Sequence, residues 1–220
     1  MSKTDLQLKH DIEEELRWDP KVNSAQIGVS VDGGAVALLG EVDTYAERWA
    51  AEDAAKRVSG VRTLRQDLAV KLLSHHTRTD QDMTAAVRAA LEWDVWVPNG
   101  VTAKVANGKV TLEGHATWNY QRDAAERAVR HLTGVVHVDD HITLKPGSSA
   151  DQVREKIEAA LQRQATSDAK SITIAAAGGK VTLTGQASSW QSIEDAASAA
   201  WAAPGVTEVV DQVKMAMQTF

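Results

Sequence analysis

The feature that most constrains this chain is a short stretch of sequence that recurs three times. It reads AVALLGEV at residues 35–42, KVTLEGHATW at 109–118 and KVTLTGQASSW at 180–190. The copies share a marker glycine at Gly40, Gly114 and Gly185, and a Gly-Val pair that starts 20 residues later at Gly60, Gly134 and Gly205. A fixed spacing of this kind indicates three copies of one structural unit in tandem.

Each copy carries the same order of local patterns. Leu8, Ile12 and Leu16 lie four positions apart, and together with Leu6 they predict a first helix with one apolar face. Two alternating runs around a glycine turn, such as Asn107-Gly108, then predict a β-hairpin. An alanine-rich second helix is expected at about 44–58, 118–132 and 189–203, and a last strand follows the Gly-Val pair.

These patterns predict an α+β fold made of three tandem α-β-β-α-β units. Each unit should hold a small three-stranded mixed sheet with two helices on one face. We expect the units at residues 1–72, 79–146 and 149–217, with short linkers near 72–79 and 145–150. A unit of about 70 residues has a thin core, so neighbouring units should pack on one another.

The six repeated glycines are expected to be structural. Gly40, Gly114 and Gly185 should serve a turn or a close approach of two backbone segments. Gly60, Gly134 and Gly205 should end the second helices in a left-handed conformation.

Composition excludes several classes of function. The net charge of −6 gives no basic surface for nucleic acid. The chain has no cysteine, so it forms no disulfide and no thiolate metal site. No Walker loop, G-x-S-x-G elbow or H-E-x-x-H motif is present, so we expect no enzyme activity and no cofactor. The first 20 residues contain neither a signal peptide nor a transmembrane segment, which favours the cytoplasm, or the periplasm if a leader was removed.

The repeated pattern resembles the BON domain, named for bacterial osmotically inducible and nodulation proteins. Unit 2 shows it as V-x-L-x-G at 110–114, followed by G-V-x-x-V-x-D-x-I-x-L at 134–144, and the other units match it closely. A position that relatives usually fill with Asn is Gln66, Asp140 or Asp211 here. The resemblance implies a non-enzymatic module associated with envelope and osmotic stress, phospholipid contact, secretin and channel assembly or potassium sensing.

Three functions follow as hypotheses. The first is a stress-related binding or scaffolding protein that contacts a phospholipid surface or a protein partner. The second is a cytoplasmic cation sensor of the potassium type, whose array compacts when the ion binds. The third is a purely structural or chaperone-like interaction protein.

The seven tryptophans allow two interpretations. They can fill seams between units and helices, where large amphipathic rings pack well. They can also form an exposed edge for lipid headgroups or a protein. For that surface, the prediction is Trp93, Trp96 and Trp118.

One stretch offers potential metal ligands. In HVDDH, the alternation of a strand places His137, Asp139 and His141 on one face, and imidazole and carboxylate can bind zinc. Units 1 and 3 carry different residues at the equivalent places, so we expect no metal site and interpret these side chains as a solvated sheet face.

Overall fold

A computed structural model describes residues 3–145, 153–163 and 171–216. Unit 1 contains α1 (Asp5–Trp18), η1 (Ser24–Gln26), β1 (Ile27–Asp32), β2 (Ala35–Val42), α2 (Tyr45–Arg57) and β3 (Thr63–Val70). A short helix, η2 (Ser74–His76), follows, and unit 2 contains α3 (Asp80–Trp93), β4 (Thr102–Ala106), β5 (Lys109–Ala116), α4 (Asn119–Arg130) and β6 (His137–Leu144). Unit 3 contains α5 (Val153–Arg163), β7 (Ile172–Ala177), β8 (Lys180–Ala187), α6 (Trp190–Trp201) and β9 (Glu208–Met215). The predicted α+β fold in three repeated units is confirmed.

All three sheets have the same topology. The first two strands form an antiparallel hairpin, and the third strand lies parallel to the second after the crossover through the second helix. The registers are equivalent, because the marker glycines Gly40, Gly114 and Gly185 pair with Leu68, Ile142 and Val213. The repeat in the sequence is therefore a repeat in hydrogen bonding.

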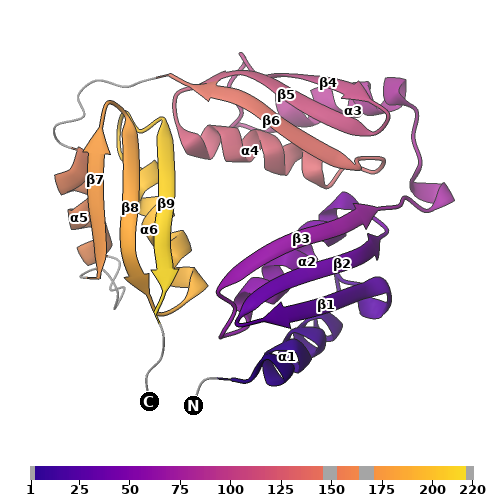
Figure 1. Ribbon diagram of the computed structural model, residues 1–220. Helices are drawn as coiled ribbons and strands as arrows, with labels where there is room; N and C mark the ends of the chain where they lie inside the picture. Colours follow the sequence, from indigo (N-terminus) through magenta and orange to yellow (C-terminus); the bar gives the residue numbers. More distant parts are fainter. Residues whose placement is uncertain (1–2, 146–152, 164–170, 217–220) are drawn as a thin grey trace.

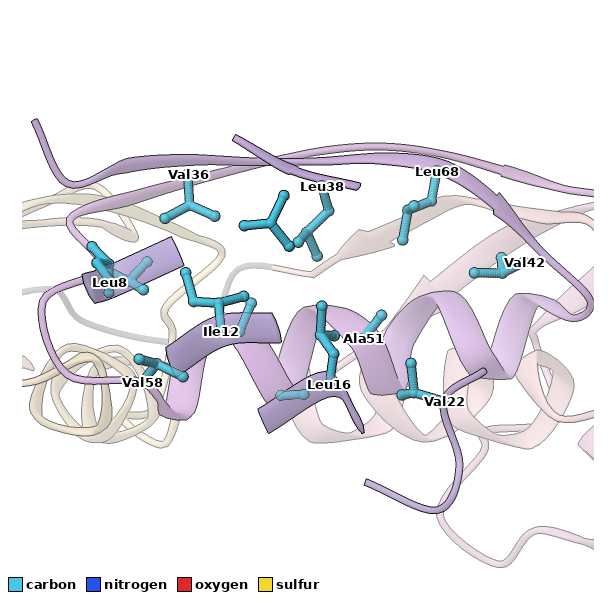
Figure 2. Packing of buried hydrophobic residues seen from close by; sticks show 14 residues of the cluster. Leu8, Ile12, Leu16, Val22, Val36, Leu38, Val42, Ala51, Val58 and Leu68 are labelled. Atoms are coloured by element: carbon cyan, nitrogen blue, oxygen red, sulfur yellow. The ribbon is translucent and has the colours of Figure 1, made fainter. Parts of the chain in front are cut away.

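The core of each unit lies between one face of the sheet and its two helices. In unit 1, Leu8, Ile12 and Leu16 of α1 are almost fully buried and point toward the sheet, where Val36 and Leu38 meet them (Figure 2). Leu6 is different: it is 79% exposed, so it does not belong to the buried face that the sequence spacing predicted. It lies two residues before Leu8, which places it on another side of the helix.

Threonine hydroxyls begin three of the helices. Thr4, Thr44 and Thr79 each accept a hydrogen bond from the backbone N–H three residues later. Such an N-cap contributes about 1 kcal/mol to helix stability.

The three units close into a ring, with α2, α4 and α6 on its inner side (Figure 1). Side chains of the second helices make contact at each of the three seams. Arg130 of unit 2 lies over Trp49 of unit 1, with 4.9 Å from its guanidinium carbon to the ring centroid. Arg122 of unit 2 lies likewise over Trp201 of unit 3, at 5.0 Å.

The third seam joins the first and last units. There Lys56 Nζ lies 3.7 Å from Glu194 Oε1. Arg130, Trp201 and Lys56 occupy equivalent positions in their helices, and each contacts the preceding unit in cyclic order. Interfaces of this head-to-tail kind generate a ring when the rotation closes, and here it closes after three units of one chain.

Candidate interaction surface

The marker glycines are required by close contact between backbones. Gly114 has a φ of +131°, and a Cβ atom on it would lie 2.2 Å from the carbonyl oxygen of Gly100. Gly40 and Gly185 repeat this, with 2.0 Å to Gln26 O and 2.1 Å to Ser171 O. No side chain fits at such distances. All three glycines therefore bring β2, β5 and β8 close to the segment that leads into the preceding strand.

The second set of glycines does not cap the second helices directly. Helix α2 ends at Arg57 with Val58 as its C-cap, and Gly60 follows two residues later with a φ of +105°. Gly134 and Gly205 have φ values of +99° and +84°. These glycines lie beyond the end of the second helix and turn the chain into the last strand, whereas the sequence pattern predicted that they would end the helix itself.

Two of the three potential ligands in HVDDH, His137 and Asp139, are engaged in contacts with protein groups. His137 Nε2 lies 2.8 Å from Asp139 Oδ1, and Lys109 Nζ lies 2.5 Å from the other carboxylate oxygen. The hydrogen bond from Lys109 lowers the pKa of Asp139. His141 is exposed, and no group of three potential ligands that could hold a metal is found within the described part of the chain.

Three tryptophans lie in the seams between units. Trp49 packs against the core of unit 2 and Trp190 against the core of unit 1. Trp190 also donates its indole N–H to the carbonyl oxygen of Val61 at 2.7 Å. Trp201, which lies beneath Arg122, is the third of these residues. All three rings agree with the interpretation that tryptophans fill the seams between units.

Unit 2 presents a group of exposed aromatic residues. Trp93 is 86% exposed, Trp96 57%, and Val95 between them 86%. The Trp96 ring contacts Tyr120 of α4 edge to face, with centroids 5.6 Å apart. We call Trp93, Val95, Trp96 and Tyr120 the aromatic surface. An exposed apolar group of this kind marks an interaction site more often than an isolated ring does.

Trp118 differs from the other two residues that the sequence singled out. It is half-buried and directly precedes α4. Its backbone N–H and that of Thr117 both donate to Gln121 Oε1, at 3.1 and 3.0 Å. Trp118 thus borders the start of a helix, whereas Tyr120, which sequence reasoning missed, joins the aromatic surface.

Unit 1 repeats part of this arrangement. Trp18 ends α1 as Trp93 ends α3, and it is 83% exposed. In both units the next residue is an aspartate whose carboxylate accepts a backbone N–H two residues on, at 3.0 Å for Asp19 and 2.9 Å for Asp94. This Asx turn stops the helix directly behind the indole. The shared Leu-x-Trp-Asp sequence is the signal that could have placed Trp18 in the candidate surface.

A hollow of about 520 Å³ in unit 2 is lined by residues that lie close to the aromatic surface in the sequence. A second hollow, of about 610 Å³, lies between units 1 and 3. The walls of the unit 2 hollow include the apolar residues Leu91, Val97, Val101 and Ala103. This end of unit 2 therefore combines protruding rings with an accessible apolar recess.

The position that relatives usually fill with Asn holds the second helix against the last strand. Gln66 Oε1 accepts from Arg48 Nε at 2.8 Å, and Gln66 Nε2 donates to the Arg48 carbonyl at 2.6 Å. In unit 2 the equivalent pair is Arg122 Nε and Asp140 Oδ2, 3.4 Å apart. These side chains have a packing role, so they are not part of the candidate surface.

The repeated fold, its seams and its exposed rings define a tandem array of small α+β binding modules. The family model of the BON domain matches residues 4–71, 79–146 and 149–217. The chain belongs to the BON domain family, as the sequence resemblance predicted. This membership places it among non-catalytic binding modules. A comparison with curated protein sequences found no significant match.

Solved structures with some likeness come from type III secretion systems. One is the C-terminal domain of CdsD, the structural protein of the system of Chlamydia trachomatis, with 13% identity, 98% of this chain and 100% of that chain covered, and a TM-score of 0.27. Another is a periplasmic domain of the inner membrane protein PrgH from S. typhimurium, with 13% identity, 86% and 93% covered, and a TM-score of 0.21. Scores this low carry no conclusion about arrangement or partners. Among the described helices, none is long and apolar enough to cross a membrane.

Proposed function

We propose that this protein is a non-catalytic binding protein that docks on phospholipid membrane surfaces through its exposed tryptophans. The observation that carries the proposal is the exposure of Trp93, Val95 and Trp96, which follow one another closely in the sequence of unit 2. Indole rings prefer the boundary between lipid headgroups and acyl chains, where the apolar body and the N–H group are both accommodated.

The repetition of the motif favours a membrane over a protein partner. Trp18 and Trp93 end equivalent helices in units related by the rotation of the ring, so they occupy equivalent places on it. A membrane offers the same interface to each exposed ring, whereas a protein partner would need a matching pocket for each. Two weak contacts reinforce each other where both rings reach the surface at once.

Charge shapes the expected lipid preference. The chain has a net charge of −6, which gives no general attraction to anionic headgroups. Binding through rings should therefore occur on zwitterionic phosphatidylcholine vesicles and should depend little on salt.

The test is co-sedimentation of the full chain with phosphatidylcholine vesicles. We expect the wild type to sediment with vesicles and the double variant Trp93→Ala with Trp96→Ala to stay largely in the supernatant. Leu73→Ala is the matched control, because Leu73 is an exposed apolar residue (44%) outside the aromatic surface. If the wild type does not sediment, or if the double variant sediments equally well, the membrane proposal is wrong and a protein partner becomes the leading alternative.

A further inference from the structure

Strand β4 is an open edge of the sheet in unit 2. The strand order is β4-β5-β6, and among the described residues β4 pairs only with β5. It lies on the outer side of unit 2, away from the other two units (Figure 1). An edge strand exposes a row of backbone N–H and C=O groups that can pair with a further strand.

The hairpin turn determines which backbone groups of β4 point outward. Asn107 and Gly108 form a two-residue turn with φ values of +52° and +76°, which is typical of a type I′ turn. The residue before such a turn, Ala106, exchanges both of its hydrogen bonds with β5, and the bonded positions alternate along the strand. The backbone groups of Ala103 and Val105 therefore point away from β5.

The hollow of unit 2 lies beside this edge. Its volume of about 520 Å³ is within the range of small-ligand pockets. Leu91 of α3, Val97 of the following loop and Ala103 of β4 form apolar parts of its walls. The strand that offers unpaired backbone groups is therefore also one wall of an apolar recess.

The hollow coincides with a small side chain at a position that repeats in all three units. Val29, Ala103 and Ile174 each lie three residues before the end of the first strand of their unit. Val29 and Ile174 are buried in the cores of units 1 and 3, whereas Ala103 is half-buried. Unit 2 thus carries a methyl group where the other units carry a branched side chain, and this leaves room beside α3.

The rim of the hollow carries both signs of charge. Arg88 and Glu92 of α3 line it, and both are exposed, with Arg88 Nε 3.9 Å from Glu92 Oε1. A surface ion pair of this kind contributes little to stability, so both groups are available to a bound molecule. A hydrocarbon chain would fill the apolar walls, but it would leave these charges and the outward backbone groups of β4 unused.

We propose that α3 and β4 form a groove for an extended segment of a partner protein, which adds to the sheet as a strand beside β4. The backbone of the segment bonds to Ala103 and Val105, and one aliphatic side chain enters the hollow. Alternate side chains of a strand share a face, so oppositely charged residues two positions to either side pair with Arg88 and Glu92. The inference does not rest on membrane binding, because it uses none of the residues of the aromatic surface.

An NMR titration of the isotopically labelled full chain tests this proposal, with the peptide acetyl-Lys-Thr-Ile-Thr-Glu-amide as the probe. We expect the amide resonances of Ala103 and Val105 to shift. The hydrogen exchange of both amides should slow, because their N–H groups become bonded to the peptide. The same peptide with alanine in place of isoleucine should bind at least about 10-fold more weakly, because the hollow stays unfilled.

Two variants separate the hollow from the strand edge. Ala103→Ile introduces the residue that unit 3 carries at this position, so the protein should be at least as stable as wild type, while its affinity for the peptide falls at least about 10-fold. Val105→Pro removes an outward N–H group without taking a hydrogen bond from the β4–β5 ladder, and it should also weaken binding. Ala106→Ile is the matched control and should bind like wild type, because Ala106 is exposed on the other face of β4.

The proposal is overturned if the peptide shifts no resonance of the groove, or if folded Ala103→Ile binds it as tightly as wild type. It is also overturned if the amides of Ala103 and Val105 exchange equally fast with and without the peptide, because no strand would then have been added. Monomeric dihexanoylphosphatidylcholine is the competing probe. If this lipid shifts the groove resonances and the peptide does not, the hollow takes a lipid chain and the proposal is wrong.

Discussion

The indole N–H of Trp190 donates a hydrogen bond to the carbonyl oxygen of Val61, 129 residues earlier in the chain. The first and third units therefore touch, although the second lies between them in sequence. Tyr45 makes the matching contact from unit 1 to unit 2, where its ring lies edge-on to His137 with centroids 6.0 Å apart. The units therefore stabilise one another through contacts at their seams and are not independent domains.

The Tyr45 contact predicts coupling between units 1 and 2. Tyr45→Ala removes a ring that is 6% exposed and should destabilise the protein by about 3 kcal/mol. Calorimetry should show the thermal transition broaden or split as units 1 and 2 uncouple. Tyr120→Ala is the control, because that ring is 46% exposed and its loss should change the transition little. Equal effects of the two substitutions would contradict the assignment of Tyr45 to the seam.

The close backbone approach at Gly114 predicts a strong effect of a single methyl group. Gly114→Ala should destabilise unit 2 by about 3 kcal/mol or more, because the new Cβ atom would overlap Gly100 O and the positive φ would be strained. Gly100→Ala is the control, because its Cβ would lie 3.9 Å from the nearest atom, His115 O. Chemical denaturation measures both, and a Gly114→Ala variant as stable as wild type would refute the steric explanation.

Trp18 should contribute to membrane binding alongside Trp93. Each of Trp18→Ala and Trp93→Ala should lower vesicle partitioning about 10-fold, as expected for the loss of one inserted apolar side chain. The double variant should lose more than either. Vesicle partitioning should be similar at low salt and at about 0.5 M salt, a concentration that is high enough to screen surface charges. A Trp18→Ala variant that binds like wild type would restrict the membrane contact to unit 2.

Burial of a carboxylate in α4 predicts a pH-dependent stability. Burial raises the pKa of Glu126, with Arg130 opposing and Asp140 reinforcing the shift. The folded chain then holds a proton at pH values where the unfolded chain has released it, so this group lowers stability as pH rises through that window. Glu126→Gln should therefore be more stable than wild type at pH 7, by less than about 1 kcal/mol.

The same reasoning fixes the behaviour in acid. Below about pH 4, near the ordinary pKa of glutamate, wild-type Glu126 is protonated and resembles glutamine, so the difference should vanish. Thermal unfolding of both proteins across this pH range is the measurement. A gap that is constant with pH would show that the stability change arises from packing and not from the charge.

The sequence was sufficient for the architecture because the signals were local and repeated. The spacing of Leu8, Ile12 and Leu16 predicted the buried face of α1, and the alternation around Asn107-Gly108 predicted a hairpin. The prediction for Leu6 was wrong, because its spacing of two residues from Leu8 places it on another side of the helix. The steric requirement for glycine at position 114 was harder to derive from the sequence, because it depends on a contact with Gly100 in another segment.

The ring and the candidate surface could be anticipated only in part. That Trp49 or Trp190 would reach another unit depends on how units are oriented, and no short-range pattern encodes that orientation. Tyr120 and Trp96 come together through tertiary packing of a loop on α4. The place of Trp18 in the candidate surface could have been predicted from the sequence, because Leu-x-Trp-Asp occurs in both units at the end of the first helix.

The central claim is that exposed tryptophans enter a lipid surface, and intrinsic fluorescence tests it most directly. Emission of the full chain should shift to the blue as phosphatidylcholine vesicles are added, because indoles leave water for the interface. The variant with Trp18, Trp93 and Trp96 all changed to alanine should show no shift, since its remaining rings are partly buried already. An unchanged wild-type spectrum, or a shift of equal size in the triple variant, would contradict the account.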